Sequence, residues 1–350
     1  MRITEAIVKL NADERLTRAE ARGVMEELLS GCVPDADIIA FLAVLRDRGE
    51  TVDVLVGFAE VMRARAAEML AEAGVQVERL HAAGPLLDTC GTGGDSLGTF
   101  NVSTASALVA AAAGVRVAKH GNRSISSRCG SADVLEALGV AIELQPGRIG
   151  ECLEQVGVVF LFAPQHHAAT RHVMNARRAL KTKTVFNLLG PLTNPLGATV
   201  QLTGVFDHAR TEAMATALAE LGTARALVVA AWDGMDEVST SGTTQVSEAG
   251  PGSLQTRQIT PEDFGVARSE PGSILGGDAA TNARLLTRVL EGQPGPYRDA
   301  VLVNTSAALM AAGRVESFTE GVALAAEALD GGAALRVLAR LVEFTRRYAR

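Results

Sequence analysis

Residues 88–95 read DTCGTGGD, a glycine-rich run that follows the apolar pair Leu86-Leu87. Residues 101–104, NVST, stand at the head of a predicted alanine-rich helix. Glycines let backbone N–H groups approach an anion closely, and a helix N-terminus adds partial positive charge. A strand, a glycine turn and a helix start therefore predict a phosphate site. A plain turn capped by Ser103 and Thr104 is the structural alternative.

The glycine run matches neither common nucleotide-binding pattern. Ser96 stands where GxGxxG needs its third glycine, and no GxxxxGK[ST] occurs in the chain. Dinucleotides and nucleoside triphosphates are therefore disfavoured as ligands.

A second candidate is the basic loop KHGNRSISSR at residues 119–128, which follows the apolar run 115–118. Its three cations, amide and hydroxyls could surround a polyanion, with lysine as a point charge and arginine as a fork. An ordinary solvated loop is the alternative. His120 by itself would more often be structural than catalytic.

A third candidate is the acid pair in DGMDE at residues 233–237, directly after a predicted strand at 226–230. Carboxylates at a strand end suit Mg²⁺, a hard cation that prefers oxygen ligands. These residues alone fit an acidic turn equally well. Together with the two anion-binding loops, they indicate a phosphorylated or pyrophosphorylated substrate.

A fourth stretch, residues 164–178, holds three histidines and Arg177. The histidines lack the HExxH spacing of a zinc hydrolase, and no nucleophile elbow accompanies them. An arginine here could bind a substrate carboxylate with two parallel hydrogen bonds, although most helix arginines are simply solvated.

The elements that must position these residues fall into two groups. The first 70 residues predict helices only, with apolar spacing from Ile3 to Leu10, a capping box at Thr17 and Glu20, and further helices over 35–47 and 51–70. Such a small bundle is expected to pack on a partner subunit or on the larger domain.

After Gly74 the pattern alternates between strands and helices, which is typical of an α/β domain. Strands are predicted around 86–87, 115–118, 158–162, 200–206 and 226–230. Helices are predicted over 131–138, 148–155, 209–221, 278–290, 298–312 and 319–348. Residues 234–270 predict loops and short strands.

Composition limits the functional class. The 350 residues suggest about two domains, and 33 Lys and Arg against 40 Asp and Glu leave a net charge of −7. That sign argues against nucleic acid or acidic lipid as a partner. Four cysteines without a CxxC pair indicate reduced thiols. No membrane partner is expected, because the longest apolar stretch is too short to span a bilayer. A cytoplasmic location is therefore predicted.

The chain resembles the anthranilate phosphoribosyltransferase family of the tryptophan pathway over nearly its whole length. The resemblance rests on seven motifs in order: GTGGD at 91–95, NVST at 101–104, KHGNRSISS at 119–127, CGSAD at 129–133, FNLLGP at 186–191, Asp236-Glu237, and GGDAA at 276–280. It implies a magnesium-dependent pentosyltransferase that joins anthranilate to phosphoribosyl pyrophosphate.

The resemblance also implies an architecture. A small helical domain, residues 1–74 with a returning segment near 174–196, would join a large α/β domain, residues 75–350, whose central sheet is flanked by helices. The fold would be that of the nucleoside phosphorylase and phosphoribosyltransferase class, and the protein is expected to form a homodimer through its helices.

The site residues implied by the resemblance form three sets. Phosphoribosyl pyrophosphate would be bound by Gly91, Gly94, Asp95, Thr99, Asn101, Val102, Ser103, Thr104, Lys119, His120, Gly121, Asn122, Arg123, Ser124, Ile125, Ser126, Ser127 and Ser131. Anthranilate would be bound by Gly91, Asn122 and Arg177. Mg²⁺ would be bound by Ser103, Asp236 and Glu237.

No residue is assigned as an obligatory acid or base, because the aryl amine of anthranilate is neutral near pH 7; His120 could assist. Three positions depart from the family pattern: Ala168 stands where proline is common, Lys181 where glycine is common, and Ala230 where histidine often precedes the acid pair. These departures concern loop shape and substrate affinity more than the reaction.

Three alternatives stay open at this stage. A pyrimidine-nucleoside phosphorylase of the same fold would also use a glycine loop and a basic loop, but it needs no metal pair. A noncatalytic nucleic-acid-binding relative would need an extended basic face. The other phosphoribosyltransferase fold has an acid pair followed by a loop rich in threonine and glycine. Residues 236–244 resemble that pattern only superficially, because they lack the expected loop spacing.

Overall fold

A seven-stranded sheet forms the centre of the molecule, in the order β3-β2-β1-β4-β5-β6-β7. The computed structural model describes residues 1–94, 97–124 and 128–350, so the candidates Asp95, Ile125, Ser126 and Ser127 lie outside the described residues. The strands are β1 (Leu86–Asp88), β2 (Arg116–Gly121), β3 (Val158–Phe162), β4 (Val200–Gly204), β5 (Arg225–Ala231), β6 (Thr244–Gly250) and β7 (Ser253–Ile259).

The first five strands pair in parallel, and β6 and β7 add an antiparallel hairpin at one edge. Parallel strands are covered on both faces, which is why their sequences read as short apolar runs. Strands β3 and β4 are buried at every position, whereas β7 at the edge is exposed except at Ile259.

The N-terminal bundle contains α1 (Ile3–Asn11), α2 (Arg18–Leu28), α3 (Asp35–Arg48) and α4 (Val52–Glu72), followed by the short α5 (Val77–Ala82). The capping box predicted at Thr17 is present, since its hydroxyl accepts the Glu20 N–H and the Glu20 carboxylate accepts the Thr17 N–H. The returning helices α10 (Met174–Leu180) and α11 (Phe186–Leu192) contribute to the same apolar core as this bundle.

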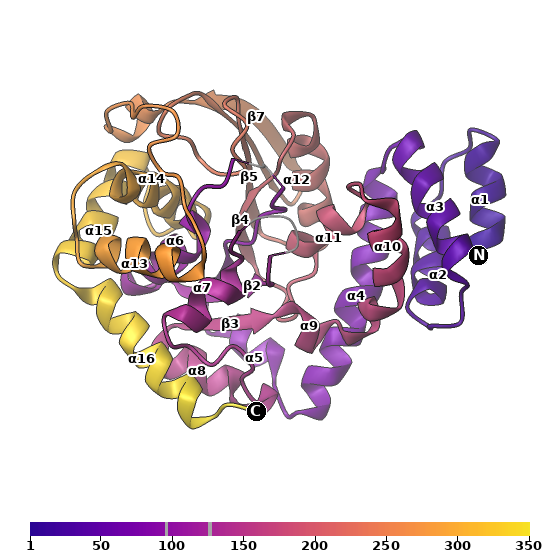
Figure 1. The fold of residues 1–350 in the computed structure, drawn as a ribbon, viewed down its shortest axis with the longest axis horizontal. Helices are drawn as coiled ribbons and strands as arrows, with labels where there is room; N and C mark the ends of the chain where they lie inside the picture. Colours follow the sequence, from indigo (N-terminus) through magenta and orange to yellow (C-terminus); the bar gives the residue numbers. More distant parts are fainter. Residues whose placement is uncertain (95–96, 125–127) are drawn as a thin grey trace.

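Helices cover both faces of the sheet (Figure 1). One group consists of α6 (Val102–Ala112), α7 (Ser131–Ala137), α8 (Ile149–Val156), α13 (Ala279–Leu290), α14 (Pro296–Ala311), α15 (Phe318–Asp330) and α16 (Ala333–Arg347). On the other face, α12 (Thr211–Glu220) packs on β5 and β6 and shares a core with α4. Short turns complete the chain: α9 (Ala163–His166), η1 (Pro146–Arg148), η2 (Ala168–Val173), η3 (His208–Arg210) and η4 (Pro261–Phe264).

The expected fold class is confirmed, and two local expectations are wrong. Residues 319–348 do not form one helix, because α15 ends at Asp330 and α16 begins at Ala333 after Gly332 adopts a φ of 67°. The alternative of a turn capped by Ser103 and Thr104 also fails. The N-cap of α6 is Asn101, without a side-chain capping bond, and both hydroxyl residues lie inside the first turn. No helix among the described residues is long and apolar enough to cross a membrane.

Candidate functional site

The candidate loops gather at the carboxyl edge of the sheet. Strands β2, β1, β4 and β5 run parallel, so the segments that follow them all leave at one edge. From β1 the chain continues to β2 on one side, while β4 lies on its other side. In open α/β sheets, ligands bind at such a point of reversal. The glycine loop follows β1 and therefore lies there.

The glycine loop contacts the end of β4 and the acid pair. The Thr92 N–H donates to the Gly204 carbonyl at 2.8 Å. A Cβ placed on Gly91 would lie 3.2 Å from that carbonyl oxygen and 3.4 Å from Oδ2 of Asp236. Gly93 and Gly94 have φ values of 64° and 85°, in the left-handed region that favours glycine. The backbone N–H groups of the glycine loop therefore lie close to the Asp236 carboxylate, a group that could bind a metal ion.

The acid turn after β5 is held from below by a helix. Asn304 of α14 is fully buried; its side chain accepts the Val238 N–H and donates to the Val238 carbonyl, each at 2.9 Å. Asp233, the first acid of the turn, accepts hydrogen bonds from Ser239 and Ser241. Asp233 thus shapes the turn, while Asp236 faces the glycine loop. Carboxylate oxygens beside a phosphate-type loop fit Mg²⁺, which prefers oxygen ligands and substrate phosphates.

Lys119 connects β2 to the start of α6. Its ammonium lies 3.2 Å from Oγ of Ser103 and 3.2 Å from Oγ1 of Thr89, and it is almost fully buried. The Thr89 hydroxyl in turn donates to the Ser103 carbonyl. A buried positive charge at a helix N-terminus reinforces an anion site. The structure thus brings together Lys119 and Ser103, two of the candidates for the substrate site.

Asp88 at the end of β1 is a fully buried carboxylate beneath these loops. It accepts the His120 N–H at 3.1 Å and an Asn194 side-chain N–H at 2.8 Å. Burial raises the pKa of Asp88 to about 6, against the lowering effects of Lys119 and these hydrogen bonds. Asp88 joins β1, β2 and the returning segment, a role that the sequence did not reveal.

His120 is buried and neutral. Burial, with His167 and His166 nearby, holds its pKa well below the usual 6.5. Its Nδ1 lies 3.1 Å from the Gly190 carbonyl, so Nδ1 carries the proton and Nε2 carries the lone pair. Nε2 is buried and has no hydrogen-bond partner among the described residues. A neutral imidazole with an unsatisfied acceptor atom can accept a proton or a hydrogen bond.

Residues 122–124 of the basic loop are fastened to α7. The Asn122 carbonyl accepts from the Ala132 N–H and from Oγ of Ser131, and the Ser124 N–H donates to Asp133. Arg123 forms ion pairs with Asp133 and Glu136. The expectation that Arg123 serves as a cation for a polyanion therefore meets a competing role, because two carboxylates already bind its guanidinium.

The start of α6 is braced by the first turn of α13 and by the segment before that helix. Asn282 donates to Oδ1 of Asn101 at 2.9 Å and accepts the Gly277 N–H at 2.7 Å. A Cβ on Gly276 would lie 2.9 Å from the Phe100 backbone, so only glycine fits there. Thr99 forms a bridge with Leu275. The GGDAA motif thus positions residues 99–101.

Arg177 lies on α10, in the returning segment. Burial lowers the pKa of its guanidinium, whose Cζ stands 5.2 Å from the centroid of the Phe186 ring. Its Nη1 lies 3.7 Å from the sulfur of Met174. Both contacts are within the returning segment, and among the described residues no carboxylate forms an ion pair with Arg177. A half-buried guanidinium of this kind suits a carboxylate ligand.

The three departures lie beside the site rather than in its loops. Lys181 ends α10 with a φ of 49°, a conformation that favours glycine. Ala168 lines a pocket of about 190 Å³ together with His166, His167, Met62 and Met69. Ala230 is buried inside β5. The glycine loop, Lys119 and Arg177 therefore keep the residues that the family pattern expects.

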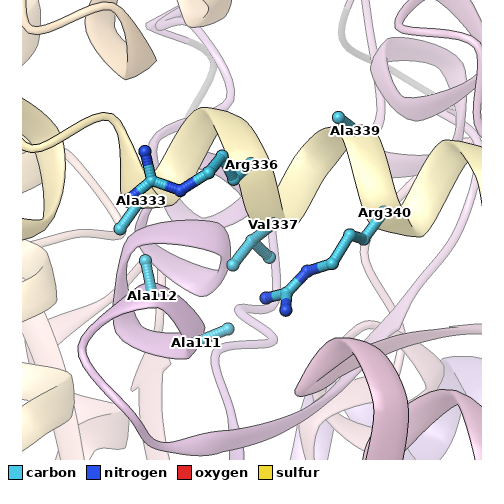
Figure 2. A pocket seen from close by; sticks show the side chains of 7 residues that line it. All are labelled: Ala111, Ala112, Ala333, Arg336, Val337, Ala339 and Arg340. Carbon is cyan, nitrogen blue, oxygen red and sulfur yellow. The ribbon is translucent and has the colours of Figure 1, made fainter.

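A second pocket, of about 330 Å³, lies between α16 and the last turn of α6 (Figure 2). Val337 and Arg340 extend from α16 towards Ala111, as Figure 2 shows. Ser103 is at the opposite end of α6. This pocket is therefore not part of the candidate site.

Four positioning residues escaped the sequence analysis: Asn194, Asn282, Asn304 and Lys183. Asn194 and Asn282 stand close to recognised motifs, so their amides offered a weak signal. Asn304 acts on a turn 66 residues away. Lys183 donates to the Gly94 carbonyl across 89 residues. Contacts at such separation leave no local pattern in the sequence.

Comparisons with known proteins agree with this geometry. Residues 83–335 match a family model described as "Glycosyl transferase family, a/b domain". Residues 4–66 match one described as "Glycosyl transferase family, helical bundle domain". A curated relative from Rubrobacter xylanophilus, named anthranilate phosphoribosyltransferase, is 50% identical over 99% of this chain and 98% of its own length.

Two solved proteins have similar structures. The anthranilate phosphoribosyltransferase of Thermus thermophilus superposes with a TM-score of 0.87 at 43% identity, over 97% of this chain and 99% of its own. The enzyme of Saccharomyces cerevisiae, in complex with PRPP and Mg, gives a TM-score of 0.87 at 26% identity over 99% and 98%. Another structure of the yeast enzyme contains 4-fluoroanthranilate.

Proposed function

The chain belongs to the anthranilate phosphoribosyltransferase family, and from this premise we propose that it transfers the phosphoribosyl group of phosphoribosyl pyrophosphate to the amine of anthranilate. Pyrophosphate is released. The activity is that of a magnesium-dependent pentosyltransferase in tryptophan biosynthesis.

The observation that carries the proposal is the meeting of three segments at the end of β1. The glycine loop supplies N–H donors, the start of α6 supplies its positive end and Ser103, and the turn after β5 supplies Asp236. A pyrophosphate ester with its metal needs these three kinds of group together. A substrate carrying a single phosphate would leave the acid pair without a role.

We assign phosphoribosyl pyrophosphate to the glycine loop, to residues 99–104, and to the basic loop from Lys119 with Ser131. Ser103, Asp236 and Glu237 would hold Mg²⁺, which when bound offsets the negative charge that grows on the departing pyrophosphate. Gly91, Asn122 and Arg177 would bind anthranilate, with the guanidinium facing the carboxylate. The half-burial of Arg177 supports that role, because partial desolvation strengthens a charge-assisted hydrogen bond.

In the reaction, the bond between ribose C1 and the pyrophosphate oxygen breaks and pyrophosphate keeps the electron pair. The amine nitrogen forms the new bond to C1 and then loses a proton. Fixed N–H donors and the buried ammonium of Lys119 stabilise the leaving group without reorganisation during the step. His120, neutral with its lone pair on Nε2, can accept the amine proton without first losing one of its own.

Two features of the organisation are also part of the proposal. Residues 1–74 with 174–196 would form one domain, residues 75–350 the other, and closure between them would align the two substrates. The apolar core that the N-terminal helices share with α10 and α11 supports the inclusion of the returning segment in this domain, and the same core continues into α12, β5 and β6 of the α/β domain. The protein would act in the cytoplasm as a homodimer joined through these helices, and light scattering after size-exclusion chromatography would measure that state.

The test is the loss of anthranilate fluorescence with purified protein, phosphoribosyl pyrophosphate and Mg²⁺. Omission of each component in turn provides the controls. Loss that requires all three is the expected result. Folded protein that consumes no anthranilate but cleaves thymidine or uridine with phosphate would refute the proposal in favour of a nucleoside phosphorylase.

A further inference from the structure

Lys183 lies in the turn between α10 and α11, far in sequence from the glycine loop. Its Nζ donates to the Gly94 carbonyl oxygen at 2.7 Å. The same nitrogen lies 3.4 Å from the centroid of the Phe206 ring, two residues beyond β4. A Cβ on Gly94 would stand 3.1 Å from Cε of Lys183. The lysine is therefore packed closely along the glycine loop.

The described part of the glycine loop is fastened near both of its ends. The hydrogen bond from Lys183 to the Gly94 carbonyl fastens the later end. At the start of the loop, the Thr92 N–H donates to the Gly204 carbonyl. At Gly94 the backbone has a positive φ, and glycine is the residue with the greatest conformational freedom. A charge-assisted hydrogen bond to its carbonyl restricts that freedom and fixes the orientation of the peptide group.

Lys183 also belongs to a different layer from the loop it contacts. Its neighbours Val185 and Phe186 are buried in the core shared with the N-terminal helices. Gly94 follows β1 of the α/β domain. The hydrogen bond thus links the helical layer to the loop that carries the candidate pyrophosphate donors.

We propose that Lys183 is a positioning residue of the transfer reaction, which acts through the Gly94 carbonyl to hold the glycine loop ready for phosphoribosyl pyrophosphate. The inference rests on the proposed function, because it assigns the loop to that substrate. The Phe206 ring limits the positions of the ammonium and so makes the hydrogen bond directional. Loss of the ammonium frees the loop, and the binding of pyrophosphate must then order it again.

The test is Lys183→Met, which keeps an unbranched apolar side chain as far as Cε but removes the ammonium that donates to Gly94 and lies over Phe206. We expect the KM for phosphoribosyl pyrophosphate to rise at least about tenfold, while the KM for anthranilate changes less than about threefold. Lys183→Arg, which keeps a donor and a cation, should restore most of the affinity.

The matched control is Lys181→Met, which removes an identical charge two residues away at an exposed position. It separates a local hydrogen bond from a general electrostatic effect on the phosphates. We expect both Michaelis constants of this variant to stay within twofold of the wild type. Thermal unfolding of all three variants shows whether they fold, and all should melt within a few degrees of the wild type.

Three results would overturn the inference in a wild type that turns anthranilate over. These are an unchanged KM for phosphoribosyl pyrophosphate in Lys183→Met, equal changes in both Michaelis constants, or an equal effect of Lys181→Met. A wild type that neither binds magnesium phosphoribosyl pyrophosphate in calorimetry nor consumes anthranilate would instead refute the proposed function, and the inference with it.

Discussion

Gly204→Ala tests how tightly the turn that carries Asp236 and Glu237, the proposed Mg²⁺ ligands, is packed against the end of β4. A Cβ at position 204 would lie 1.5 Å from the Asp236 carbonyl oxygen. Because such contacts are not seen below 3.0 Å, the backbone at Asp236 must retreat by about 1.5 Å. A misplacement of about 1 Å at a reacting site can cost about 100-fold in rate. We therefore expect kcat/KM to fall at least about 100-fold, or about 2.7 kcal/mol of transition-state stabilisation.

The assay is anthranilate consumption at several Mg²⁺ concentrations, with a melting curve for each protein. Gly150→Ala in α8 is the matched control. The new Cβ would contact only Cδ2 of Leu80, at the ordinary van der Waals distance of 3.7 Å. That variant should keep its activity and gain about 0.5–1 kcal/mol of stability. A Gly204→Ala protein that retains activity within threefold, with an unchanged Mg²⁺ requirement, would refute the assignment of this turn.

Three further outcomes are expected. Arg177→Ala should raise the KM for anthranilate at least about tenfold and change that for phosphoribosyl pyrophosphate little; equal effects on both would contradict a carboxylate-binding role. Replacing both Asp236 and Glu237 by alanine should raise the Mg²⁺ concentration needed for half-maximal activity, and an unchanged titration would reject them as ligands. Because the pKa of Asp88 is raised from 3.8 to about 6 in the folded protein, its stabilisation is present below pH 4 and lost as the pH rises to 6. Relative to Asp88→Asn, the wild type should lose about 3 kcal/mol of unfolding free energy over that range. Denaturant titrations of both proteins at several pH values would measure this loss. A difference in unfolding free energy that stays constant with pH would show that Asp88 titrates normally.

The sequence predicted those features of the site that local residue patterns determine. Apolar runs marked the parallel strands, and the glycine run marked the turn after β1, where positive φ values are needed. Thr17 and Glu20 marked a helix start correctly because a capping box involves only residues close in sequence. The resemblance to a known family then ordered these separate motifs into one site.

The contacts that fasten the site could not be predicted, because they join residues far apart in the chain. Asn304 and Lys183 act across 66 and 89 residues on backbone groups, which carry no side-chain signal. Arg123 shows a second limit of local patterns. Its residue type predicts a phosphate ligand, and the fold in addition places Asp133 and Glu136 of α7 against its guanidinium. Residue type indicates what a side chain can bind, and the fold decides which partner is near.

The most direct test of the central claim is the stoichiometry of pyrophosphate released to anthranilate consumed, measured in one reaction with purified protein and Mg²⁺. The transfer mechanism requires a ratio of one throughout the time course, with no pyrophosphate formed when anthranilate is omitted. Pyrophosphate release that continues without anthranilate would mean that water is the acceptor. No release at all from a folded protein would contradict the assignment of the carboxyl edge of the sheet to phosphoribosyl pyrophosphate.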